Sequence, residues 1–126
     1  YFKFTKAIVA GQPIQLYNRG DMRRDFTYID DIVSGISAVT QAPASGHRLY
    51  NLGNHRVEQL SHLVECLENY LERKAIIERL PMQPGDVYET YADISDSNRD
   101  FGYQPRTTLA DGLTHFIAWY RSFYGC

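Results

Sequence analysis

The chain has 126 residues, of which 44% are hydrophobic and 22% charged, a composition typical of one soluble globular domain. Its net charge of -2 gives no broad basic surface for nucleic acid or an anionic membrane, and no apolar run approaches the roughly 20 residues of a membrane span. Two cysteines form neither a disulfide framework nor a zinc-binding spacing. These features favour a cytoplasmic protein with no nucleic-acid or membrane partner.

A helix and a strand open the chain. Apolar residues at helical spacing predict a helix over residues 1–10, and Gly11-Gln12-Pro13 ends it. Residues 14–17 have the pattern of a short strand, which leads into a turn at 18–21. Because Tyr1 is not methionine and already lies in the helical pattern, we expect that an N-terminal segment has been removed.

A charged segment follows the turn. Arg23-Arg24 precede a β-prone run at 26–29, so we expect them on a connection between ordered elements, where binding residues collect. Asp30-Asp31 stand where the helical pattern of 32–39 begins, and we expect them to cap that helix. Arginine suits a phosphate because its planar fork donates two parallel hydrogen bonds. The alternative for these arginines is a solvated charged turn.

The rest of the chain predicts short strands and helices joined by loops. The expected ranges are a loop at 42–46, a strand at 49–52, an amphipathic helix at 60–71, a strand at 75–80, a Pro/Gly loop at 82–86, an extended segment at 92–94, a helix at 96–101 ended by Gly102, and a last helix capped by Thr108. No linker or internal repeat divides the chain, which gives an α/β class.

Two further side chains are candidates for ligand contacts. In the turn Gln83-Pro84-Gly85-Asp86, proline fixes φ and glycine permits the turn, so Asp86 can point inward and accept hydrogen bonds from two neighbouring hydroxyls, as on a ribose. The alternative is an ordinary turn aspartate. Tyr17 either stacks on a flat base or packs against its neighbours.

Five segments, in order along the chain, resemble the extended short-chain dehydrogenase/reductase enzymes that act on nucleotide-sugars. They are Arg24-Asp25-Phe26, Tyr50-Asn51-Leu52-Gly53-Asn54, Leu80-Pro81-Met82-Gln83-Pro84-Gly85-Asp86-Val87, Tyr91-Ala92-Asp93 and Phe101-Gly102-Tyr103-Gln104-Pro105. Within this family the chain is similar to the UDP-glucuronate 4-epimerases. The resemblance implies that residues 1–126 form the C-terminal, UDP-sugar-binding domain of such an enzyme, truncated at its N-terminus, with the Rossmann core missing.

The resemblance also implies roles for individual residues. Arg24 would contact the pyrophosphate of the nucleotide-sugar, Asp86 would hold the ribose, and Tyr17 would lie near the uracil. Gln83 stands where galactose-type epimerases have a phosphate-binding arginine, which fits the glucuronate branch better. A second positive charge on the phosphates would then come from Arg23 or from a residue outside this chain.

The implied cofactor is NAD, which takes a hydride from C4 of the sugar and returns it to the other face while a tyrosine acts as base. The chain has no Gly-x-Gly-x-x-Gly loop to hold a dinucleotide. Tyr70-x-x-x-Lys74 matches the catalytic signature of the superfamily, but Tyr70 continues the core face of a helix, and we interpret the pair as structural. We therefore assign no catalytic, NAD-binding or metal-binding residue here, and expect NAD on the missing N-terminal portion.

Three functions remain open at this point. The first is a fragment of a UDP-glucuronate 4-epimerase that is homodimeric at full length and inactive as this chain alone. The second is a fragment of another UDP-sugar epimerase, decarboxylase or dehydratase, and the third is a non-catalytic nucleotide-sugar-binding module. For a fragment, we expect an exposed apolar surface that drives association, formed by residues 50–52 together with Tyr1, Phe2, Phe4, Ile8 and Val9.

Overall fold

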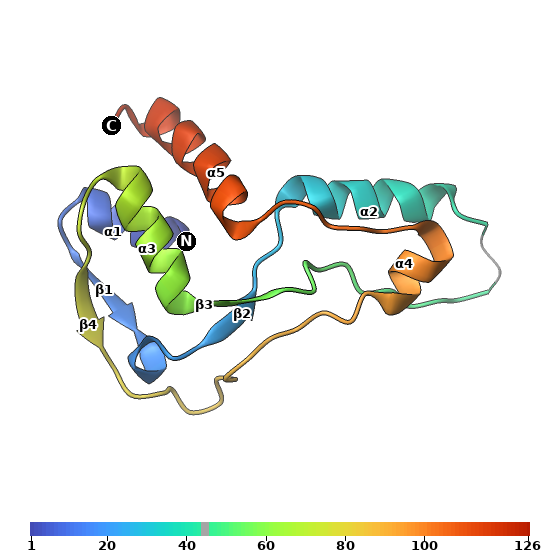
Figure 1. The fold of residues 1–126 in the computed structure, drawn as a ribbon, viewed down its shortest axis with the longest axis horizontal. Coiled ribbons are helices and arrows are strands. Elements are labelled where there is room, and N and C mark those ends of the chain that lie inside the picture. The colour runs from blue at the N-terminus through green and yellow to red at the C-terminus, as the bar shows by residue number, and fades with distance from the viewer. Residues whose placement is uncertain (44–45) are drawn as a thin grey trace.

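The computed structural model describes residues 1–43 and 46–126, so positions 44 and 45 of the predicted loop at 42–46 lie outside the described residues. The elements, in chain order, are α1 (Phe2–Val9), β1 (Pro13–Leu16), the 3₁₀ helix η1 (Tyr17–Gly20), β2 (Arg23–Asp25), α2 (Ile29–Gln41), β3 (Val57–Gln59), α3 (Leu60–Leu71), β4 (Ile76–Arg79), α4 (Ser95–Phe101) and α5 (Leu109–Tyr124). Figure 1 shows α1, β1, β4, α3 and α5 gathered at one end, α2 and α4 at the other, and β2 and β3 between them.

Two small sheets join segments that are distant in the sequence. β1 pairs in parallel with β4, and β2 pairs antiparallel with β3 so that Arg24 lies opposite Glu58. The other edge of β2 is also occupied, because the Arg23 N–H donates to the Tyr88 carbonyl at 2.9 Å and the Thr90 N–H donates to the Arg23 carbonyl at 3.2 Å. β2 is therefore flanked on both edges, by β3 and by the segment after the Pro/Gly turn.

One hydrophobic core lies where α3 meets α1, α5 and β1. The predicted amphipathic face of α3 is confirmed, since Leu63 and Leu67 are 1% and 0% exposed. Burying one leucine side chain stabilises the fold by about 1.5–3 kcal/mol. The buried members of the core are Ile8, Ile14, Leu16, Leu63, Val64, Cys66, Leu67, Leu71, Leu109, Leu113 and Ile117.

The predicted ends of two helices are confirmed. Thr108 caps α5, because its hydroxyl oxygen accepts a hydrogen bond from the Asp111 N–H at 3.1 Å. Gly102 ends α4 with φ of 70°, a left-handed conformation that glycine adopts without steric cost.

The β-prone run at 26–29 forms no strand, and the predicted strand at 49–52 is wrong. The strand β2 forms over Arg23–Asp25 instead, because β3, which the sequence pattern did not indicate, supplies its hydrogen-bonding partner. Arg23 and Arg24 therefore lie on a strand, not on a connection. Residues 49–52 form no strand, since no other strand in the described part of the chain pairs with them.

The prediction that Asp30 and Asp31 cap α2 is also wrong. The N-cap position is Tyr28, and no side chain caps this helix. The Asp31 carboxylate instead accepts hydrogen bonds from the Arg106 N–H at 3.1 Å and the Thr107 N–H at 3.0 Å. Burial alone would raise the pKa of Asp31, but these hydrogen bonds outweigh it and lower the pKa below its ordinary value. Asp31 thus fastens the segment before α5 to the start of α2.

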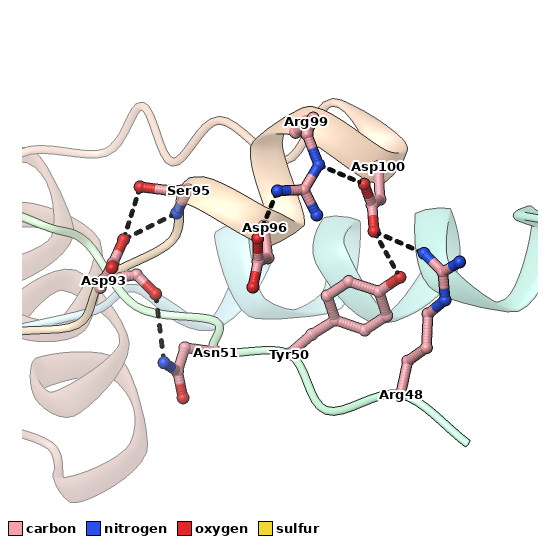
Figure 2. Close-up of polar contacts among 8 residues, drawn as sticks. All are labelled: Arg48, Tyr50, Asn51, Asp93, Ser95, Asp96, Arg99 and Asp100. Carbon is pink, nitrogen blue, oxygen red and sulfur yellow. Dashed lines mark hydrogen bonds and ion pairs between the residues drawn. The ribbon is translucent and has the colours of Figure 1, made fainter. Parts of the chain in front are cut away.

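A polar network attaches α4 to the segment that precedes β3 (Figure 2). Asp100 accepts hydrogen bonds from Arg99 Nε at 2.7 Å, from the Tyr50 hydroxyl at 2.8 Å and from Arg48 Nη1 at 3.0 Å. The hydrogen bonds from Arg99 and Tyr50, with the charges of both arginines, lower the pKa of Asp100 to about 2. The Asp100 carboxylate is therefore the centre that joins α4 to residues 48–50.

The predicted exposed apolar surface is only partly present at the N-terminus. Ile8 is 2% exposed and belongs to the core, whereas Tyr1 is 60% exposed. A clearer apolar stripe lies on α2, where Ile29, Val33 and Ile36 are 61%, 55% and 50% exposed at helical spacing. Among the described residues, no helix has the length and apolar character needed to cross a membrane.

Candidate functional site

The fold brings Arg24 and Asp86 into direct contact, although they lie 62 positions apart in the sequence. Arg24 Nη2 donates to Asp86 Oδ1 at 2.9 Å, and the two side chains are 24% and 31% exposed. Arg24 Nη1 also donates to the Arg23 carbonyl at 2.8 Å and the Tyr88 carbonyl at 3.1 Å. Three hydrogen bonds thus hold the guanidinium in place before any ligand arrives.

This ion pair still leaves groups that a ligand can use. Asp86 Oδ1 accepts from Arg24 and from the Val87 N–H at 2.8 Å. Within the described residues, neither Asp86 Oδ2 nor Arg24 Nε takes part in a hydrogen bond. A hydroxyl can therefore bind the free carboxylate oxygen and an anion can bind the free edge of the guanidinium, with the ion pair intact.

The turn that carries Asp86 forms as predicted. The Asp86 N–H donates to the Gln83 carbonyl at 3.2 Å, and Gly85 has φ of 83°, which glycine adopts far more readily than other residues. Gln83 is exposed on this turn, three positions before Asp86, and its side chain forms no hydrogen bond among the described residues.

No hydrogen bond joins Tyr17 to that pair in the described part of the chain. Tyr17 is half-buried in η1, not at the end of a strand, and its hydroxyl donates to Gln15 Oε1 at 3.4 Å. The next two residues, Asn18 and Arg19, have φ of 48° and 57°, a left-handed backbone that continues the turn.

Arg23 faces a different partner from its neighbour. Its Nη1 lies 3.7 Å from Glu89 Oε2, and both side chains are more than 40% exposed. An exposed ion pair at this distance contributes little to stability. Of the two adjacent arginines, Arg24 is thus the one fixed beside Asp86.

Asp25 is the central residue of this region, and the sequence did not single it out. Its carboxylate accepts hydrogen bonds from the backbone N–H groups of Asn54 at 2.8 Å, His55 at 3.0 Å and Ala92 at 3.0 Å. Three of the segments that carry the resemblance, those around residues 24, 54 and 92, therefore meet at one carboxylate. The only sequence signal was a carboxylate next to Arg24, and its donors are remote in the chain.

Close packing explains why residue 53, in the same region, is a glycine. A Cβ atom on Gly53 would lie 2.3 Å from the Ala92 Cβ and 3.2 Å from Asp25 Oδ2, so any side chain here would force the segments apart. The Gly53 carbonyl also accepts a hydrogen bond from the Tyr103 hydroxyl at 3.0 Å. Burial, with the charges of Asp31 and Asp25, raises the pKa of Tyr103 to about 12, so this hydroxyl keeps its proton at neutral pH.

Tyr70 and Lys74, which the sequence analysis interpreted as structural, each have partners elsewhere in the fold. Tyr70 packs against the hydrophobic core, and its carbonyl accepts from Arg121 Nη2 at 2.8 Å. Lys74 Nζ lies 2.6 Å from Glu68 Oε2 on the surface. The lysine is therefore engaged by a carboxylate rather than by the tyrosine four residues before it.

Comparison with known structures defines the class of fold, which is the mixed α/β fold of extended short-chain dehydrogenase/reductases. A UDP-glucuronic acid 4-epimerase from Bacillus cereus, solved in complex with UDP-glucuronic acid and NAD, superposes with a TM-score of 0.88 at 27% identity. The superposition covers 96% of this chain and 39% of that chain.

Sequence comparison narrows the class to a family. Residues 1–53 match the model of the NAD dependent epimerase/dehydratase family. The chain is 43% identical over 98% of its length to Protein CapI of Staphylococcus aureus, and 42% identical over 99% of its length to UDP-glucuronate 4-epimerase 1 of Arabidopsis thaliana. These matches relate the chain to the NAD dependent epimerase/dehydratase family. It spans 42% and 33% of the length of those two relatives, which is consistent with the predicted C-terminal portion.

Proposed function

We propose that the chain is the substrate-binding part of an NAD-dependent UDP-sugar epimerase that interconverts UDP-glucuronate and UDP-galacturonate. The observation that carries this proposal is the Arg24–Asp86 pair, which places a guanidinium and a carboxylate at 2.9 Å with hydrogen-bonding atoms left for a ligand. The relatives named as UDP-glucuronate 4-epimerases match the chain over nearly its whole length, which supports this sugar.

In this proposal each candidate residue has one role on the nucleotide. Arg24 binds the diphosphate, because a guanidinium donates bidentate hydrogen bonds to phosphate oxygens. Asp86 accepts hydrogen bonds from the ribose hydroxyls through its free oxygen. Tyr17 lies near the uracil. Gln83 lies at the edge of the nucleotide site and contributes no charge to the binding of the phosphates. None of these residues touches the reacting C4 carbon.

NAD does not fit the residues of this chain. A dinucleotide pyrophosphate needs a glycine-rich loop between a strand and the N-terminus of a helix, and the sequence has no such motif. In the proposal, NAD and the catalytic tyrosine are therefore held by a part of the protein outside these 126 residues. Oxidation and re-reduction at C4 take place there, and this chain holds the nucleotide.

Two alternatives keep the nucleotide site and change the reaction. Another UDP-sugar epimerase, a decarboxylase or a dehydratase would use the same contacts to the nucleotide. A non-catalytic nucleotide-sugar-binding module is favoured by one observation, namely that the chain has a preformed Arg24–Asp86 site and no dinucleotide-binding motif. Homodimerisation of the full-length protein and a cytoplasmic location are further parts of our proposal.

The full-length protein tests these alternatives directly. It is incubated separately with UDP-glucuronate, UDP-galactose and UDP-N-acetylglucosamine, and the products are separated by chromatography. We expect UDP-galacturonate from UDP-glucuronate and much slower conversion of the two neutral sugars. Release of carbon dioxide would indicate the decarboxylase, and turnover of UDP-galactose alone would reject the glucuronate assignment. Binding of all three without any turnover would favour the non-catalytic module.

A further inference from the structure

A second, polar cavity of about 620 Å³ lies near the start of α4, and none of the contacts proposed for UDP involves it. It is bordered by the loop after Gly53, the segment before α4 and the segment before α5. Its charged and aromatic lining residues are His55, Arg56, Tyr91, Asp93 and Arg106. We propose that this cavity binds a small molecule through a phosphate or carboxylate group.

Two arginines give the cavity its positive charge. Arg56 and Arg106 both line it, and the side chains of both are exposed. Among residues 1–43 and 46–126, neither guanidinium forms an ion pair or a hydrogen bond, whereas Arg24, Arg48 and Arg99 are each paired with an aspartate. Two guanidiniums with unused donors on one cavity suit an oxyanion, which accepts several hydrogen bonds at once.

The backbone beneath both arginines is fixed. Asp25 accepts from the His55 N–H at 3.0 Å, directly before Arg56, and Asp31 accepts from the Arg106 N–H at 3.1 Å. The two carboxylates thus anchor the loops that present the guanidiniums. A ligand would therefore find both loops already in place and would not have to order them.

His55 lines the same cavity, next to Arg56. Its Nδ1 atom is buried and has no hydrogen-bonding partner among the described residues. Its backbone has φ of 50°, an uncommon conformation for a non-glycine residue that is often found at ligand sites. Because Nδ1 has no exposed surface, it does not face the open cavity, and the imidazole ring serves in this proposal as a reporter beside the ligand rather than as a ligand contact.

The one carboxylate in the lining does not cancel this charge. Asp93 Oδ1 already accepts from the Ser95 N–H at 3.0 Å and the Ser95 hydroxyl at 2.6 Å, and these bonds lower the pKa of Asp93. Asp93 therefore stays ionised and bound to α4. Among the residues that line the cavity two arginines stand against this one carboxylate, while the carboxylates of Asp25 and Asp31 lie behind the lining, each bonded to backbone N–H groups. Its volume lies within the range of small-molecule sites, which is about 300–1,000 Å³.

A titration of inorganic phosphate at constant ionic strength, followed by NMR of the histidine ring protons, tests this site. It uses the 126-residue chain carrying Arg24→Ala, so that the UDP site does not contribute. We expect a saturable shift of one ring signal, assigned to His55 because it is missing in His55→Asn, whose amide side chain tolerates positive φ. Acetate in place of phosphate shows which oxyanion is preferred.

Matched variants decide whether the arginines are responsible. Arg56→Ala and Arg106→Ala should each weaken phosphate binding at least about tenfold, which corresponds to one lost charge-assisted hydrogen bond. Arg121→Ala serves as the control, because its guanidinium is bonded to the Tyr70 carbonyl and does not line the cavity. A His55 signal that phosphate does not shift, or equal weakening in the Arg121 variant, would overturn the proposal.

Discussion

Replacing Arg24 by alanine should weaken the binding of UDP far more than replacing the arginine next to it. Arg24 is fixed by Asp86 and by two carbonyls, with its Nε edge free for an anion. One charge-assisted hydrogen bond contributes about 1.5–3 kcal/mol, so losing it lowers the affinity for UDP roughly 10- to 150-fold. The ion pair lies only partly in solvent, at 24% and 31% exposure, so we expect an effect inside this range rather than below it.

Arg23→Ala is the matched control. Its guanidinium lies 3.7 Å from Glu89 on an exposed surface, so its loss should change the affinity by about 0.5 kcal/mol or less, or roughly twofold. Isothermal titration calorimetry of UDP into the chain and both variants measures the difference. Equal effects of the two substitutions on the affinity for UDP would refute the assignment of the diphosphate to Arg24. They would favour the alternative that both arginines belong to a solvated charged surface.

The same substitution makes a kinetic prediction for the full-length enzyme. Arg24 and Asp86 hold the nucleotide equally in the ground and transition states, so Arg24→Ala and Asp86→Ala should raise KM for the UDP-sugar and leave kcat almost unchanged. Asp86→Ala alone should also reduce the preference for ribose over deoxyribose donors. A fall in kcat with constant KM would place these residues at the reacting carbon, against the proposal.

Four other outcomes follow from the structure. Leu67→Ala, at a fully buried core position, should lower the free energy of unfolding in urea by about 2–5 kcal/mol. The folded-state pKa of Asp100 is about 2, below the ordinary value, so its stabilising contribution is present above about pH 4 and is lost as pH falls toward 2. Asp100→Asn should flatten that part of the pH–stability curve. Ile36→Glu, on the exposed stripe of α2, should reduce self-association in sedimentation. The chain alone should neither retain NAD nor epimerise UDP-glucuronate, and Tyr70→Phe should not alter kcat of the full-length enzyme.

The sequence predicted the elements whose signal is local. The periodic leucines of α3, the Thr108 cap of α5 and the glycine that ends α4 each depend on residues within one or two turns of each other. The turn before Asp86 was predictable for the same reason, since Pro84 and Gly85 restrict its backbone directly.

The strands were less predictable because pairing depends on residues far away. The β-prone run at 26–29 has a better strand composition than Arg23–Asp25, but β3 and residues 88–90 offer hydrogen bonds only to the latter. The strand composition of 49–52 was equally uninformative, because a strand needs a partner and the described residues supply none.

At the candidate site, the roles of two carboxylates could not be predicted for the same reason, because their hydrogen-bond donors are remote in the sequence. Asp31 has the position of a helix cap, and only the fold shows that two N–H groups more than 70 residues away bind it instead. Asp25 is likewise defined by donors on three remote residues. Local sequence therefore identified Arg24 and Asp86 as charged candidates, whereas their contact and the carboxylates that support the surrounding loops required the structure.

A crystal structure of the chain with bound UDP would test the central claim most directly. We predict a diphosphate oxygen within hydrogen-bonding distance of the Arg24 guanidinium and a ribose hydroxyl on Asp86 Oδ2, with the Arg24–Asp86 pair retained. UDP bound elsewhere, with both side chains still bonded only to each other and to the protein, would contradict the claim that this pair is the nucleotide site.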